Sequence, residues 1–165
     1  MLDRTDKMRP SSLKEVVVQL ATAISMIREF ERRLAASIGT PLFEWEKRRY
    51  PKRGTIVWEE GEATYWFHGG GCSLTMNGST LDYNYGYPNI EPGKRPICFG
   101  PWKLARTIQG VREKRVVDQV SRVTEERAMK DLLAMAEIGL SKKPPPGRGY
   151  FEVNEALLYR YLANA

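Results

Sequence analysis

Apolar residues recur every three or four positions between residues 13 and 38, and this spacing predicts one amphipathic helix over residues 12–38. Ser12 and Glu15 have the spacing of a capping box at its start, and Gly39 stands where a C-terminal stop is expected. Because the helix is long for a small domain, its apolar stripe should form a main wall of the core. The stripe consists of Leu13, Val17, Leu20, Ile24, Ile27, Phe30 (or Glu31), Leu34 and Ile38.

Strand-like segments replace the helical pattern over residues 54–86, which predicts an antiparallel meander of about four strands. Asn77-Gly78 is a strong two-residue hairpin signal, and Glu60-Gly61-Glu62 marks a second hairpin. In the last strand, apolar and aromatic residues alternate with Asp82 and Asn84. The two sets should therefore face opposite sides of the sheet.

Helical spacing returns over residues 101–139, and Pro101 suits the first turn of a helix. Gly110 weakens the pattern without ending it, and Thr124 could cap a separate second helix. One kinked helix and two helices both fit this stretch. The other segments are expected to be a loop at 86–98, an extended Pro-rich spacer at 141–149 and a last helix at 153–162.

These elements together predict a single α+β domain over residues 1–165, in which a long N-terminal helix and C-terminal helices pack on the meander. No apolar run reaches the roughly 18 residues that a membrane span needs. The charged N-terminus also has no apolar segment typical of a secretory signal. We therefore expect a soluble, cytoplasmic protein with no membrane partner.

Cysteine and histidine are scarce: the chain has Cys72, Cys98 and the single histidine His68. Two cysteines are too few for a disulfide framework, and structural zinc needs four ligands. We expect no metal and no cofactor. The sequence leaves open whether the two thiols meet in space.

Charge is distributed unevenly along a chain whose formal net charge is +6. Residues 54–86 contain no lysine or arginine and four acidic residues, whereas both flanks are basic. This asymmetry indicates separate surfaces for partners, or else a solvated helical exterior around a sheet. The four acidic residues are Glu59, Glu60, Glu62 and Asp82.

The most unusual string is His68-Gly69-Gly70-Gly71-Cys72, between two predicted strands. Three glycines permit positive φ angles and a close approach to the backbone, so the string could form a glycine-lined notch. Asp82 across the sheet could then orient His68, and Cys72 could serve as a nucleophile. The alternative is a tight, bulged corner that holds a hydrogen-bonded histidine. The first interpretation describes a small enzyme with a His68, Cys72 and Asp82 site.

A basic patch over residues 47–53 includes Arg48, Arg49 and Tyr50. Basic side chains beside an aromatic ring can bind a nucleic-acid backbone and stack on bases. Such a patch can equally bind an acidic protein. Nucleic acid is therefore one possible partner.

Three strings in the chain resemble a small uncharacterised bacterial family. The strings are the HGxGC pattern at residues 68–72, the apolar-Asp-aromatic strand ending in Gly86, and the Trp-x-Leu helix start at Trp102. The resemblance covers about residues 57–105 and departs from the family at Phe99-Gly100-Pro101, where the family has Phe-Asp before the tryptophan. Proteins of this kind are associated with the immunity proteins that accompany bacterial polymorphic toxins. The resemblance implies binding of a toxin and supplies no catalytic residue.

We therefore expect a non-enzymatic binding protein, most specifically an immunity protein that neutralises a cognate bacterial toxin by direct contact. A small enzyme and a nucleic-acid-binding module remain the alternatives. The sequence leaves the oligomeric state open. The residues expected to bind are His68, Asp82, Glu59, Glu60, Glu62, Trp66, Arg48, Arg49 and Tyr50.

Overall fold

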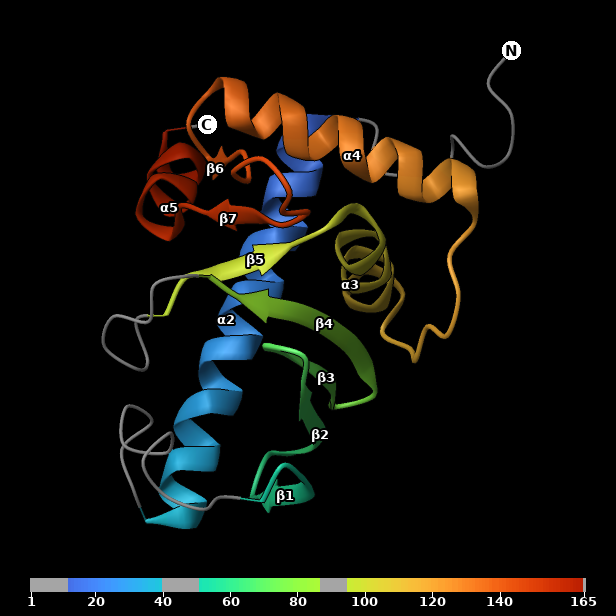
Figure 1. Ribbon diagram of the computed structural model, residues 1–165. Coiled ribbons are helices and arrows are strands. Elements are labelled where there is room, and N and C mark those ends of the chain that lie inside the picture. The colour runs from blue at the N-terminus through green and yellow to red at the C-terminus, as the bar shows by residue number, and fades with distance from the viewer. Residues whose placement is uncertain (1–11, 40–50, 87–94, 165) are drawn as a thin grey trace.

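The computed structural model describes residues 12–39, 51–86 and 95–164, and within them it contains one seven-stranded antiparallel sheet and four helices (Figure 1). The α+β class is confirmed. Strand order is β1-β2-β3-β4-β5-β7-β6, so a five-strand meander is extended by a C-terminal pair of strands. The strands are β1 (Arg53–Trp58), β2 (Gly61–His68), β3 (Gly71–Met76), β4 (Ser79–Tyr85), β5 (Ile97–Phe99), β6 (Ser141–Lys142) and β7 (Phe151–Val153).

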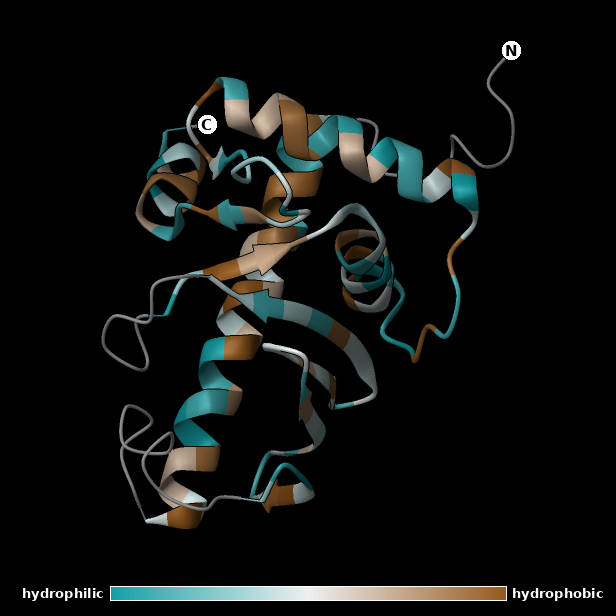
Figure 2. Cartoon of the chain, in the orientation of Figure 1, coloured by the Kyte–Doolittle hydropathy of each residue, from teal (hydrophilic) through white to brown (hydrophobic). Residues whose placement is uncertain are grey.

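Helix α2 (Leu13–Ile38) confirms the long N-terminal helix. The Ser12 hydroxyl accepts a hydrogen bond from the amide of Glu15 at 3.3 Å, and Gly39 ends the helix with φ +67°. Figure 2 shows hydrophobic residues recurring along α2. The central stripe residues Val17, Leu20, Ile24, Ile27, Phe30 and Leu34 are buried.

Two-residue turns join the first four strands. Asn77 and Gly78 both have positive φ, as the predicted hairpin requires. Gly69-Gly70 makes the same kind of turn, because His68 pairs directly with Gly71. The expected bulged corner is therefore wrong: the ladder continues to the turn without an extra residue.

The sheet has seven strands where about four were predicted. The three additional strands, β5, β6 and β7, contain only two or three residues each, so they are too short to show an alternating pattern. β5 lies partly in the segment expected to be a loop, and β6 lies in the segment expected to be a spacer. Backbone pairing supplied by neighbouring strands makes these segments extended.

The 101–139 stretch contains two helices, α3 (Pro101–Glu113) and α4 (Arg122–Glu137). α3 ends at Lys114, which adopts a left-handed conformation with φ +53°. α4 is capped by Ser121, whose hydroxyl accepts from the amide of Thr124 at 3.1 Å. Thr124 is therefore the capped residue, and the expectation that it caps the helix is wrong.

Helix α5 (Glu155–Ala163) begins two residues later than predicted, because Val153 belongs to β7. It packs against α2, where Arg28 forms an ion pair with Glu155 at 2.6 Å and another with Glu31 at 2.7 Å. Burial raises the pKa of Glu31, although the Arg28 contact opposes that shift. This polar cluster links α5 to α2.

The two faces of the sheet differ. One face packs on α2, where Phe30 lies 5.4 Å from Tyr65 between ring centroids. α3 covers the opposite face mainly over β4, where Gly110 lies against Thr80, and it also contacts β5. A Cβ added at Gly110 would stand 2.5 Å from the Thr80 carbonyl oxygen. The glycine that weakens the helical pattern is thus the residue that lets α3 approach the sheet. Among the described residues, no helix has the length and apolarity to cross a bilayer.

Candidate functional site

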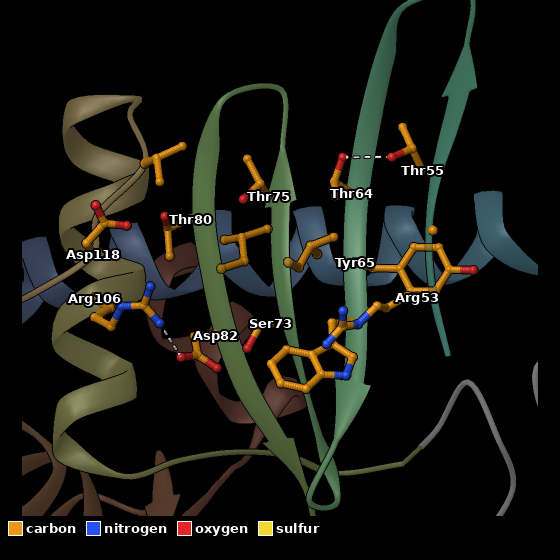
Figure 3. Close-up of a pocket in the computed structure, with 15 residues that line it drawn as sticks. Arg53, Thr55, Thr64, Tyr65, Ser73, Thr75, Thr80, Asp82, Arg106 and Asp118 are labelled. Atoms are coloured by element: carbon orange, nitrogen blue, oxygen red, sulfur yellow. Dashed lines mark hydrogen bonds and ion pairs between the residues drawn. The ribbon is translucent and has the colours of Figure 1, made fainter. Parts of the chain in front are cut away.

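A groove of about 520 Å³ lies where α3 leaves the sheet uncovered (Figure 3). Its floor is the face of β1–β4 that points away from α2, and α3 with residues 116 and 118 forms one wall. We call the uncovered part of this floor the open face. It is defined by the side chains of Arg53, Thr55, Thr64, Trp66, Ser73 and Thr75.

Four threonines lie in one row across the floor of the groove (Figure 3). Thr55 pairs with Thr64, Thr64 with Thr75, and Thr75 with Thr80. The hydroxyl oxygens of Thr55 and Thr64 are 3.1 Å apart. β-branched side chains suit a pleated sheet, and their hydroxyls can both donate and accept hydrogen bonds. Thr55, Thr64 and Thr75 therefore offer a regular polar surface to a partner, whereas Thr80 is buried and its hydroxyl oxygen accepts from the amide of Val117 at 2.8 Å.

A second row crosses the sheet one side-chain pair further along, through Arg53, Trp66, Ser73 and Asp82. Trp66 is 44% exposed and is the largest side chain on the open face. The guanidinium of Arg53 lies 4.3 Å from the centroid of the Trp66 ring, within cation–π range. The indole is thus accessible to a partner, and the Arg53 side chain from the adjacent strand β1 packs against it.

His68, the last residue of β2, contacts the same indole. Its ring centroid lies 4.2 Å from that of Trp66, and its Nε2 is 2.8 Å from the Ser73 hydroxyl oxygen. His68 is half-buried. Arg53, His68 and Ser73 together limit the orientations available to Trp66, which reduces the entropy that a partner must remove on binding.

Asp82 does not pair with His68, and the predicted orienting contact is therefore wrong. Asp82 is buried, its Oδ2 accepts from Arg106 Nη1 at 2.6 Å, and its Oδ1 lies 3.6 Å from Lys103 Nζ. Arg106 also donates from Nε and Nη2 to the carbonyl of Val117, at 3.0 and 2.7 Å. The ion pair thus fastens the segment after α3 to β4 and builds the wall of the groove.

Cys72 lies on the face that packs against α2, because it pairs with Phe67 and Tyr83. Burial raises the pKa of its thiol to about 12, which disfavours the thiolate that a nucleophile needs. His68 and Cys72 therefore occupy opposite faces, and the structure does not assemble the His68, Cys72 and Asp82 site. Cys98 pairs with Asn84 on the face away from α2, so the two free thiols do not meet.

The remaining predicted residues fall in three places. Glu62 is exposed and lies on the same face of β2 as Trp66. Glu59 and Glu60 form the exposed turn between β1 and β2, at the end of the sheet. Arg48, Arg49 and Tyr50 lie outside the described residues, so of the basic patch only residues 51–53 are described.

Sequence reasoning missed Ser73 and Arg106 as parts of the site, and it placed Arg53 in the basic patch over residues 47–53 without connecting it to Trp66. Alternation within β2 and β3 was sufficient to place Thr64 with Trp66 and Ser73 with Thr75 on single faces. The register between strands, which brings Arg53 to Trp66 and Ser73 to Asp82, has no local signal. Across the described ranges, no three histidine, cysteine or carboxylate side chains cluster as metal ligands.

A family described as a domain of unknown function (DUF6896) matches residues 20–152. No curated protein and no solved structure matches the chain.

Proposed function

The chain belongs to the DUF6896 family, and we propose that it is a non-enzymatic binding protein that acts as an immunity protein in the bacterial cytoplasm. It neutralises a cognate toxin by binding it directly through the open face of the sheet. The observation that carries this proposal is Trp66, a large aromatic side chain that is exposed beside the polar side chains of the groove and flanked by Arg53 and His68.

Tryptophan and arginine dominate the energetics of many protein interfaces when they lie near the centre of the contact. Trp66 lies near the centre of such a surface, because the threonine row runs beside it and α3 borders the far side of that row. Hydroxyls, two arginines and two aspartates line the groove, so it can pair with either sign of charge. Such mixed surfaces favour specificity and fast association.

The contacts of the three candidate catalytic residues favour a binding protein over an enzyme. His68 is engaged with Ser73, Asp82 with Arg106, and Cys72 lies behind the sheet. The hydrogen bonds of His68 and Asp82 fix the conformation of the open face and of the groove wall. The assignment to toxin immunity rests on the resemblance of the HGxGC, apolar-Asp-aromatic and Trp-x-Leu strings.

The experiment tests binding to the product of the gene that neighbours this one. We expect a complex on co-expression, and we expect Trp66→Ala to weaken it by about thirtyfold, which corresponds to the roughly 2 kcal/mol lost at an interface hot spot. The matched control is Tyr159→Ala on α5, because Tyr159 is 43% exposed and lies away from the open face.

Three results would count against the proposal. If no complex forms, the immunity assignment is wrong. If the complex forms and both variants bind like the original chain, binding occurs on another surface. If purified protein instead binds nucleic acid with an affinity that falls steeply with salt, the basic patch carries the function.

A further inference from the structure

A second cavity, of about 710 Å³, lies over the other end of the same sheet face. Its floor is a row across four strands, because Asn84 pairs with Cys98, Cys98 with Glu152, and Glu152 with Lys142. The row is built from backbone-paired residues, so its side chains stand on a rigid base. No part of the proposed toxin contact uses it.

Two segments wall this cavity. The Gly69-Gly70 turn forms one side, and a Cβ at either glycine would have nothing within 4 Å. Residues 143–150, which connect β6 to β7, supply several of the other lining residues. Tyr150 belongs to this connection, and Lys103 Nζ lies 5.8 Å from its ring centroid. Gly69 and Gly70, from the string predicted to line a notch, therefore do line a cavity, but His68 is not one of its lining residues.

Positive charge predominates around the cavity. Among the described residues, Arg95, Lys142, Lys143 and Arg148 line it against the single carboxylate of Glu152. In a partly enclosed site, such charges attract an anion more strongly than they do in bulk water.

Arg95 is held in place before any ligand arrives. Its guanidinium lies 5.2 Å from the centroid of the Tyr85 ring, and its carbonyl accepts from Arg28 Nη2 at 2.8 Å. Burial lowers the pKa of Arg95, a direction that marks partial removal of its charge from water. A fixed and partly desolvated guanidinium is a favourable partner for carboxylate or phosphate oxygens.

Asn84 supplies a second, independent indication. Its side chain is buried with 3% exposure and lines the cavity, and its Oδ1 has no hydrogen-bond partner among the described residues. The absence of a side chain at Gly71 makes room for it, since a Cβ there would stand 2.7 Å from Asn84 Nδ2. A buried acceptor that has no donor destabilises the folded protein. This oxygen is itself covered, so a ligand hydroxyl or amino group removes that cost when the Asn84 amide turns toward the cavity.

We propose that this cavity binds a small organic anion, a carboxylate or a phosphate, that also carries a hydrogen-bond donor for Asn84. The cationic side chains hold the anionic groups, and Asn84 Oδ1 accepts from the donor. The site is separate from the open face, so its failure and the failure of the immunity proposal are independent.

Titration calorimetry on the full chain with four probes tests this proposal. Citrate and tricarballylate are matched tricarboxylates that differ by one hydroxyl, and pyrophosphate and inorganic phosphate represent the phosphate source. We expect one source to bind, and Arg148→Gln to weaken that binding about tenfold through loss of a charge-assisted hydrogen bond. Arg122→Gln is the control, because Arg122 has a 91% exposed side chain on α4 away from the cavity.

A separate comparison tests whether the ligand must carry a hydrogen-bond donor for Asn84. If carboxylates bind, citrate should bind more tightly than tricarballylate, and Asn84→Ala should remove the difference. If phosphates bind, Asn84→Ala should weaken pyrophosphate less than Arg148→Gln does, because that probe has little donor capacity. Absence of binding by all four probes, or equal weakening by Arg148→Gln and Arg122→Gln, would overturn the proposal. Equal affinity for citrate and tricarballylate would overturn the role of Asn84.

Discussion

At the scale of single residues, several side chains have roles that only their partners reveal. Arg106 joins Asp82 to the carbonyl of Val117, and its guanidinium lies 4.6 Å from the centroid of the Trp102 ring. Trp66 is the contrary case, because it is large, exposed and held by neighbours that leave its outer surface available. The first residue stabilises the wall of the groove, and the second is available to a partner.

Arg106→Met should lower the free energy of unfolding by about 3 kcal/mol or more, because it leaves the Asp82 carboxylate buried without its main partner. Urea unfolding measures the change. Arg122→Met, which removes an exposed pair with Glu126 at 3.3 Å, is the control and should change stability by less than about 1 kcal/mol. Equal effects of the two substitutions would mean that the Asp82 pair contributes little.

At the scale of elements, helix α3 shows how local propensity yields to packing. Glycine within a helix costs about 1 kcal/mol relative to alanine, yet Gly110 lies inside α3. The close approach to Thr80 explains its presence, since α3 and β4 could not pack at this distance with a larger residue.

Gly110→Ala should therefore destabilise the protein despite its better helix propensity. The added Cβ would clash with the Thr80 backbone, and overpacking of this kind costs about 1–3 kcal/mol. Thermal unfolding measures the loss, with Gln109→Ala on the same helix as the control. A rise in melting temperature for Gly110→Ala would show that α3 can shift away from β4 at no cost.

At the scale of the whole molecule, one continuous core joins the long helix, both faces of the sheet and the C-terminal elements. Ionisable groups are buried within or beside it. Burial raises the pKa of both thiols, Cys72 and Cys98, to about 12, and it raises the pKa of Tyr83 and Tyr85. The folded protein therefore keeps protons at alkaline pH that the unfolded chain releases.

Stability should accordingly be lost as the pH rises above about 9, where thiols of an unfolded chain ionise. Each retained proton reduces the free energy of unfolding by up to about 1.4 kcal/mol per pH unit, until the folded thiols titrate near 12. Urea unfolding at pH 7, 9 and 10 measures this slope. The double variant Cys72→Ala/Cys98→Ala should have a shallower slope between pH 9 and 10, and an unchanged slope would contradict the assignment to the thiols.

The sequence by itself determined the elements whose pattern extends over many residues. The stripe from Leu13 to Ile38 defined α2 with both caps, and Asn77-Gly78 defined the β3–β4 hairpin. Alternation also assigned Trp66 and His68 to one face. These features are local, because helical and strand periods and turn conformations depend on neighbours a few residues away.

Only the tertiary structure decided which of those residues meet. The threonine row, the Arg53–Trp66 contact and the Asp82–Arg106 pair all join different elements, and cross-strand register or helix packing creates each of them. Strands of two or three residues also have no pattern of their own and form because a neighbour offers its backbone. The open face and the basic cavity are therefore products of the fold. The sequence gives the identity of each residue in them but does not show that these residues lie together.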